Sequence, residues 1–187
     1  RFTNVAPLTK IPFQPMADGE VVRITGESLK PFTFCGLDRL RLVFVNGRFS
    51  RELSSIWPLQ NGVNVSSLAA ALDSDPERVE PCLARHASDK DHTFVALNTA
   101  FVEDGAFVYV PPGQMVEHPL HLLFVSTSPD EPSVSHPRNL IVVGDNSQIT
   151  IVESYVGFSG EVYFTNAVTE IIAGQHAVIE HCKLQQE

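Results

Sequence analysis

The sequence has no long apolar run and no excess of positive charge. No apolar stretch approaches the roughly 20 residues that a membrane-spanning helix needs, and residues 1–10 lack the apolar centre of a secretory leader. Acidic residues number 22 and basic residues 13, which gives a net charge of −9. Nucleic acids are bound by clustered Lys and Arg. We therefore expect a protein that binds neither membranes nor nucleic acids.

Cysteine is also scarce. The thiols Cys35, Cys82 and Cys182 are odd in number and widely spaced, which argues against a disulfide framework and favours a reducing, intracellular compartment. Iron–sulfur clusters are usually held by several thiolates, and only Cys182 lies in the second half of the chain. We expect no bound cluster and no other cofactor.

Familiar catalytic motifs are missing as well. The chain has neither a G-x-x-x-x-G-K-[ST] phosphate loop nor a G-x-G-x-x-G turn. The stretch "GFSG" around Ser159 lacks the final spacing of a G-x-S-x-G nucleophile elbow. We assign no catalytic, cofactor-binding or metal residue.

The cluster His176, His181 and Cys182 near the end of the chain raises the question of a metal site. On a strand, His181 and Cys182 point to opposite faces, and the five-residue step from His176 to His181 also reverses the face. Zinc needs three or four ligands at recognisable spacing. We therefore expect Cys182 to be buried between stacked strands, and His181 to lie at the surface or at a corner.

Two further groups of polar residues receive structural interpretations. His118 and His121 would share a face on a helix, but they lie in a strand-rich, proline-broken segment, so we expect them to be structural or solvated. Glu103 and Asp104 precede Gly105, which is typical of a turn rather than of a catalytic carboxylate pair.

Residues 1–90 indicate a small α+β region. A strand leads into Asn46-Gly47, a pair that suits a type I′ hairpin turn, and Asn61-Gly62 offers a second such turn. Residues 66–86 predict two short helices, with Asp75 as the cap of the second and Pro76 in its first turn. We place a domain boundary near residue 90.

Residues 91–187 indicate short strands, and helical spacing disappears from about residue 93. An exposed loop is expected at 126–138, which carries three prolines. A weak repeat aligns Gly144 with Gly174, which sets Ile149 opposite Ile179 and Val152 opposite Cys182. In both copies the apolar residues move from one face of the strand to the other partway along. A straight strand with one buried face does not allow this, whereas a corner between two short strands does. The region therefore reads as the first turns of a parallel β-helix with two short strands per turn. A β-sandwich gives similar strands.

These segments carry a resemblance to a known family. The stretches 94–126, 136–157 ("HPRNLIVVGDNSQITIVESYVG") and 163–187 resemble the core of the SufB/SufD family of iron–sulfur cluster assembly proteins. "RFTNVAPL" and "RLVFVNGRFS" are similar to the N-terminal region of its SufD branch. The resemblance implies a mainly β fold, a right-handed β-helix. It also implies a scaffold or accessory subunit that is not itself an enzyme and that pairs with a SufB-like subunit and a SufC-like ATPase.

The resemblance also sets expectations about extent and location. Family chains begin before Arg1 and continue beyond Glu187, so we expect an N-terminal fragment. It should self-associate through residues 170–187, or fray there if it stays monomeric. The expected compartment is the cytoplasm, or the plastid stroma in a photosynthetic eukaryote. The alternatives are a β-helix enzyme acting on polysaccharides and a stand-alone metal-binding module centred on Cys182.

Overall fold

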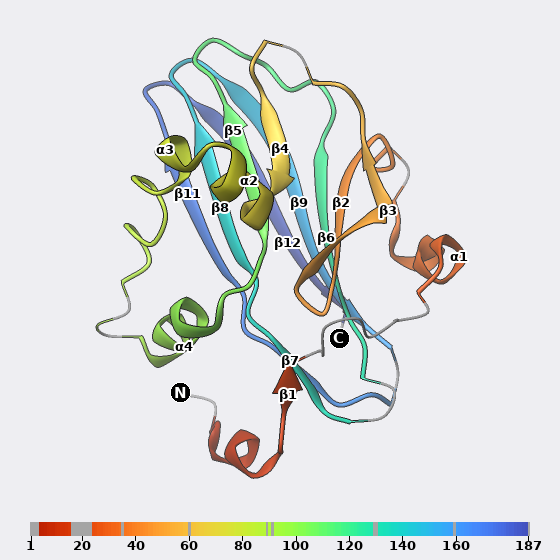
Figure 1. The fold of residues 1–187 in the computed structure, drawn as a ribbon. Coiled ribbons are helices and arrows are strands. Elements are labelled where there is room, and N and C mark those ends of the chain that lie inside the picture. The colour runs from red at the N-terminus through yellow and green to blue at the C-terminus, as the bar shows by residue number, and fades with distance from the viewer. Residues whose placement is uncertain are drawn as a thin grey trace.

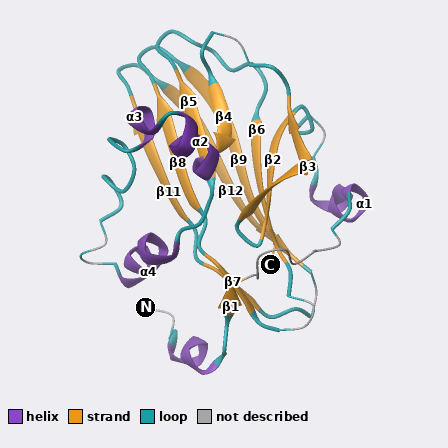
Figure 2. Ribbon diagram, viewed as in Figure 1, coloured by secondary structure: helices purple, strands orange, loops and turns teal. Residues whose placement is uncertain are grey.

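The fold is built mainly from parallel strands (Figures 1 and 2). The computed structural model describes residues 4–15, 24–34, 36–59, 61–88, 90, 92–128, 131–158 and 160–186. Its elements are η1 (Ala6–Lys10), β1 (Gln14–Pro15), α1 (Gly26–Leu29), η2 (Lys30–Phe32), β2 (Leu40–Val45), β3 (Arg48–Ile56), β4 (Asn64–Ser67), α2 (Leu68–Ser74), α3 (Pro76–Val79), α4 (Thr93–Phe101), β5 (Ala106–Val110), β6 (Leu120–Ser126), β7 (Ser133–Ser135), β8 (Arg138–Val143), β9 (Gln148–Gly157), β10 (Tyr163–Thr165), β11 (Val168–Ala173) and β12 (Val178–Gln186). Within these ranges no helix is long and apolar enough to cross a membrane.

The strands form two large sheets and a short third one. One sheet has the order β11-β8-β5-β4, the second β12-β9-β6-β2-β3, and the third β1-β7-β10. β10, β11 and β12 pair in parallel with β7, β8 and β9, always at a step of 30 residues, as Ile171 with Ile141 and Ile179 with Ile149 show. The 30-residue repeat expected from Gly144 and Gly174 is confirmed, and each passage of the chain lies on the preceding one.

The turn between the two large sheets recurs at the same place in successive passages. Gly113, Asn146 and His176 each occupy it with a positive φ, of 75°, 55° and 58°. Just before the turn the layers approach closely: a Cβ on Gly144 would lie 2.6 Å from Pro112 N, and one on Gly174 2.6 Å from Asp145 N. Only glycine fits such an approach.

The main core lies between the two large sheets. It joins residues such as Val108 and Ile141 of one sheet to Leu122 and Ile149 of the other. The rings of Phe44, Phe124 and Tyr155 stack in register at 4.8 Å from one strand to the next. Parallel in-register pairing therefore builds an aromatic ladder along one column of the core.

Helices and loops cover the outer faces of both large sheets. α2 and α3 lie over the β5–β8–β11 sheet (Figure 1), where Leu68 and Val79 pack on Phe107 and Leu140. On the other sheet, Leu29 of α1 packs over β2, β6 and β9. Among the described residues this second cover includes none of β12, and Cys182 on that strand is exposed.

A buried ion pair fastens helical parts of the chain to the sheets. Glu170 of β11 accepts hydrogen bonds from Arg138 Nη2 of β8 at 2.7 Å and from Arg138 Nε at 3.0 Å, and both side chains are 2% exposed or less. Glu170 also accepts the backbone N–H groups of Ala84, His86 and Ala87 at 2.8–3.0 Å. Burial alone raises the pKa of Glu170, but these donors outweigh it and hold the pKa below its usual value.

The sequence predictions for residues 1–90 are largely confirmed. The hairpin β2–β3 turns at Asn46 and Gly47, whose φ angles are 48° and 83°. Asn61-Gly62 also has positive φ angles, but β3 and β4 belong to different sheets, so that turn closes no hairpin. α2 and α3 are the two short helices expected, although the side chain of Asp75 pairs with Arg78 instead of capping α3. Since β2 and β4 pair with strands beyond residue 90, both large sheets are continuous across that position.

Three predictions for residues 91–187 were wrong. β9 and β12 run unbroken through the positions where a corner was expected. Apolar residues lie on both faces of β9 because both faces are covered. Ile149 packs in the core between the two large sheets, and Val156 packs under the cover on the outer face. The segment 126–138 contains β7 and the buried Arg138.

The third error concerns α4, since no helix was expected beyond about residue 93. Its propensity is modest, and buried Asn98 fixes it in place. Asn98 Nδ2 donates to the carbonyl oxygens of Pro137 at 2.9 Å and Asn166 at 2.8 Å. These tertiary contacts override a strand-like local pattern.

His121 yields a prediction on pH dependence. It is fully buried, its Nε2 lies 2.9 Å from Ser154 Oγ, and burial together with neighbouring Arg41 lowers its pKa to about 4. Below about pH 6.5 the unfolded chain therefore binds a proton that the folded chain rejects, and the free energy of unfolding falls as the pH drops toward 4. The expected loss is on the order of 3 kcal/mol. Urea unfolding at pH 7 and pH 4.5 measures it.

Carboxylates also titrate in this range, so the test is a difference between variants. His121→Gln should remove this loss in the free energy of unfolding between pH 7 and pH 4.5. His118→Gln, at an exposed position, should leave the loss unchanged. Identical slopes for wild type and His121→Gln would show that His121 is not buried as a neutral group.

Candidate functional site

A charged cluster occupies the interior between the two large sheets. Glu153 of β9 points inward with its side chain fully buried and lies 2.8 Å from His181 Nε2 and 3.5 Å from Lys183 Nζ, both of β12. It also accepts hydrogen bonds from Tyr155 Oη at 2.6 Å and from Thr169 Oγ1 of the opposite sheet at 3.0 Å. The interior therefore changes along the stack, from apolar between the first strands to charged between the last.

The electrostatics of this interior cluster favour a charged Glu153. Burial alone raises the pKa of Glu153, but hydrogen bonds from His181 and Tyr155 and the positive charge of Lys183 outweigh it and bring the pKa below its usual value. Lys183 also lies 4.4 Å from the ring centre of Tyr155. A buried carboxylate, a partly exposed imidazole and a partly exposed ammonium thus lie in one network, which can exchange protons or hold a polar group.

Sequence reasoning assigned Cys182 to the wrong environment. Cys182 is exposed, not buried. It pairs with Val152 on the outer face of its sheet, which the α1 cover does not reach at β12. His181 was expected at the surface or a corner; its residue is exposed, but it pairs with Ile151 on the inner face and its imidazole contacts Glu153. The misplaced corner caused the wrong assignment of Cys182.

The other candidates have structural surroundings. His118 is exposed, with its Nε2 3.2 Å from Arg39 Nη1. Asp104 accepts the backbone N–H groups of Phe49, Ala69 and Gly105 at 2.8–3.2 Å, and Glu103 pairs with Arg48 at 3.0 Å. These contacts engage both carboxylates, and the turn interpretation stays a prediction.

The remaining candidates do not form a metal site in the described part of the chain. There, no three His, Cys, Asp or Glu side chains are grouped so as to hold a metal ion. His176 is exposed at its turn, and Cys82 packs half-buried beside α3. Cys35 and Ser159 lie outside the described residues.

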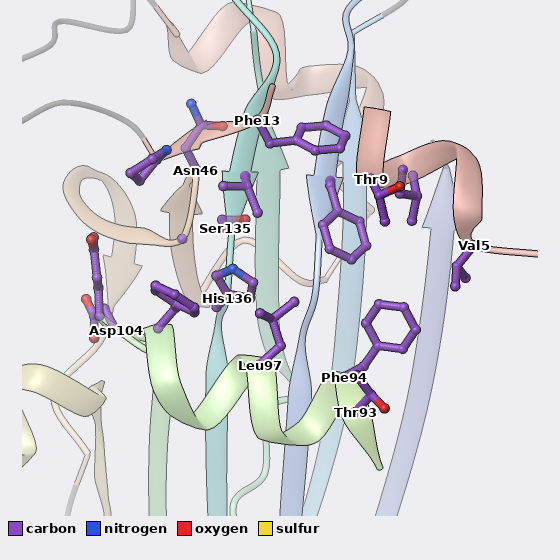
Figure 3. Close-up of a pocket in the computed structure, with 17 residues that line it drawn as sticks. Val5, Thr9, Phe13, Asn46, Thr93, Phe94, Leu97, Asp104, Ser135 and His136 are labelled. Carbon is purple, nitrogen blue, oxygen red and sulfur yellow. The ribbon is translucent and has the colours of Figure 1, made fainter. Parts of the chain in front are cut away.

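A largely apolar pocket of about 540 Å³ lies between the N-terminal segment and α4. Figure 3 shows Val5, Thr9 and Phe13 of the N-terminal segment on one side, Thr93, Phe94 and Leu97 of α4 on the other, and His136 between them. Four phenylalanines line the pocket, together with short stretches around the Asn46 turn and Asp104. No sequence motif predicts this pocket, because its walls come from five separate segments.

Comparison with known families accounts for both halves of the chain. Residues 25–122 match the SufBD protein N-terminal region, and residues 124–187 match the SufBD core domain of SUF system FeS cluster assembly. This chain belongs to the SufBD family. The resemblance stated from the sequence is confirmed.

Individual SufBD relatives extend well beyond the matched part. An iron–sulfur cluster assembly SufBD family protein, slr0076 of Synechocystis, is 32% identical over the whole chain, which covers 42% of that relative. The chloroplastic protein ABCI7 of Arabidopsis thaliana is 30% identical over 78% of the chain and 31% of its own length. SufD of Bacillus subtilis is 31% identical over 64% of the chain and 28% of its own length. The chain thus spans less than half of the length of each of these relatives.

The exposure of Cys182 in this SufBD chain can be tested with thiol chemistry. A bulky disulfide reagent should modify Cys182 in the native protein almost as fast as in the unfolded one, whereas half-buried Cys82 should react more slowly. Peptide mapping by mass spectrometry separates the thiols. Cys182→Ser should change the free energy of unfolding by less than about 0.5 kcal/mol. Slow native labelling of Cys182, with a loss above about 1 kcal/mol in the variant, would restore the buried assignment.

Proposed function

We propose that this protein acts as a SufD-like scaffold or accessory subunit in SUF iron–sulfur cluster assembly. The observation that carries the proposal is the match of two consecutive regions, 25–122 and 124–187, to the N-terminal and core parts of SufBD proteins. A relative named iron–sulfur cluster assembly protein SufD supports the choice of branch, as do the stretches 1–8 and 41–50 noted above. Its partners in this proposal are a SufB-like subunit and a SufC-like ATPase.

The proposal includes the architecture. We take the parallel sheets to be the first turns of a right-handed β-helix. Support comes from the 30-residue step between the last two passages in each of the three sheets and from the turn that Gly113, Asn146 and His176 share. Stacked turns build a long, stiff surface from a short repeat, which suits a subunit that holds partners in place.

A scaffold role agrees with how the charged side chains are used. Arg138, Glu170 and Asp104 are buried and engaged in contacts that hold backbone segments. Glu153 is surrounded by donors from three strands. Side chains committed in this way stabilise the fold, and we propose that the protein is not itself an enzyme.

The proposed location is the cytoplasm, or the plastid stroma in a photosynthetic eukaryote. A relative named as chloroplastic supports the plastid alternative. The low and odd number of thiols agrees with a reducing compartment in either case.

Deletion of the gene tests the proposal. Cells that lack the protein should lose most aconitase activity under iron limitation, because aconitase needs an iron–sulfur cluster, while malate dehydrogenase, which has none, should be unchanged. A tagged copy that restores aconitase should co-purify with a SufB-like and a SufC-like subunit. Normal aconitase in the deletion strain, together with a tagged protein that elutes alone, would contradict the proposal.

A further inference from the structure

We propose that the pocket between η1 and α4 binds a small, uncharged, planar ring compound that carries a hydrogen-bond acceptor. The inference is independent of the assembly role and concerns a site that lies outside the paired faces of the two large sheets. It rests on the size of the pocket, on its aromatic lining, on the chemistry of His136 and on the charges around the pocket.

The pocket has the size and lining of a small-molecule site. Its volume of about 540 Å³ lies within the range of roughly 300–1,000 Å³ typical of such sites. The ring of Phe164 forms its aromatic centre, with Phe13 at 5.8 Å and Phe94 at 6.0 Å. Aromatic rings prefer offset or edge-to-face partners at such distances. A flat ligand ring placed between these phenylalanines can therefore contact the face of one ring and the edge of another.

Part of this aromatic lining is left open to solvent. Phe94 is 40% exposed and Phe101 61% exposed, although both line the pocket. Large apolar side chains at the wall of a cavity favour an apolar occupant, because covering them removes their surface from water. The occupant must also fit between η1 and α4, as Figure 3 shows for Thr9 and Leu97, which favours a thin, planar molecule.

The hydrogen-bond network fixes what His136 offers to an occupant. Asn166 Nδ2 donates to the backbone oxygen of Phe94 at 2.8 Å, so this atom is the amide nitrogen. The same nitrogen lies 3.2 Å from His136 Nδ1, which therefore accepts. Burial lowers the pKa of His136, so the ring is neutral at pH 7 and its proton is on Nε2.

This Nε2–H group is the donor that the pocket presents. In the part of the chain that the structure describes, His136 has no second hydrogen-bond partner besides Asn166. Phe101 stacks on the imidazole at 5.7 Å and Phe164 meets it edge-on at 6.5 Å, so both flank the ring without accepting its proton. A carbonyl oxygen or a ring nitrogen on the ligand completes the arrangement.

The charges of the described lining residues disfavour ionic ligands. None of the described lining residues is Lys or Arg, so an anion would find no counter-charge. The two lining carboxylates are already engaged, Glu103 by Arg48 and Asp104 by three backbone N–H groups. A cation would therefore compete with existing partners. A neutral ligand meets neither difficulty.

Fluorescence titration with prodan, an uncharged planar naphthalene ketone, tests the proposal on the whole chain. The probe should bind saturably at one site, with blue-shifted emission. Leu97→Trp fills the pocket and should abolish binding. His136→Phe keeps a ring but removes the donor, so the Kd should rise about three- to tenfold, as expected for one neutral hydrogen bond.

Matched variants separate the pocket from other surfaces. Val178→Trp adds the same side chain at a half-exposed position on β12, away from the pocket, and should bind the probe as wild type does. If Leu97→Trp does not fold, as judged by circular dichroism, exposed Thr93→Trp at the start of α4 takes its place. Absence of saturable binding, or equal binding by the pocket variants and Val178→Trp, would overturn the proposal.

Discussion

The buried ion pair between Arg138 and Glu170 joins parts of the chain that are far apart in sequence. Removing both charges from water costs several kcal/mol per ion, which a bare pair does not recover. Here each guanidinium nitrogen of Arg138 and each carboxylate oxygen of Glu170 has at least one partner. Glu170 binds both nitrogens of one edge of Arg138 and three backbone N–H groups at 84–87, while Arg138 Nη1 donates to Asn98 Oδ1 of α4 at 3.1 Å. The pair therefore fixes the end of the helical segment and α4 onto two adjacent parallel strands.

From this pair the polar contacts continue toward the pocket and the interior. Asn98 donates to the backbone oxygen of Asn166, and the Asn166 side chain sets the protonation of His136. In the other direction, Thr169 is the neighbour of Glu170 on β11 and faces inward to Glu153. Because successive residues of a strand point to opposite faces, one strand serves the outer anchor and the charged interior at once. The pocket wall and the interior cluster thus depend on the same placement of β11.

Features set by local chemistry could be predicted from the sequence. Asn46-Gly47 specified a hairpin turn, and the spacing from Gly144 to Gly174 gave the correct register, because glycine is required where two layers approach within contact distance. The sequence did not show which face of each strand points into the interior between the sheets. β9 is covered on both faces and carries a buried carboxylate among its inward residues, so apolar character does not mark the interior. This is why Cys182 was assigned inward and Glu153 was overlooked.

Features set by distant contacts left no signal of their own. α4 is held by Asn98 and its partners at residues 137 and 166, and the pocket is assembled from five segments. Arg138 and Glu170 look like ordinary surface residues in the sequence, and only the parallel pairing of β8 with β11 brings them together. Family resemblance predicted the stack of strands correctly, but it did not show which polar residues bind which helices.

Hydrogen exchange at the amides of Ala84, His86 and Ala87 tests the anchoring role of the ion pair most directly. These N–H groups belong to a segment outside helices and strands, yet they donate to Glu170. They should exchange almost as slowly as amides of β8 and β9, and Glu170→Gln should release them while Glu180→Gln, an exposed change on β12, should not. Exchange of these amides at the rate of an open loop in the wild-type protein would contradict the account.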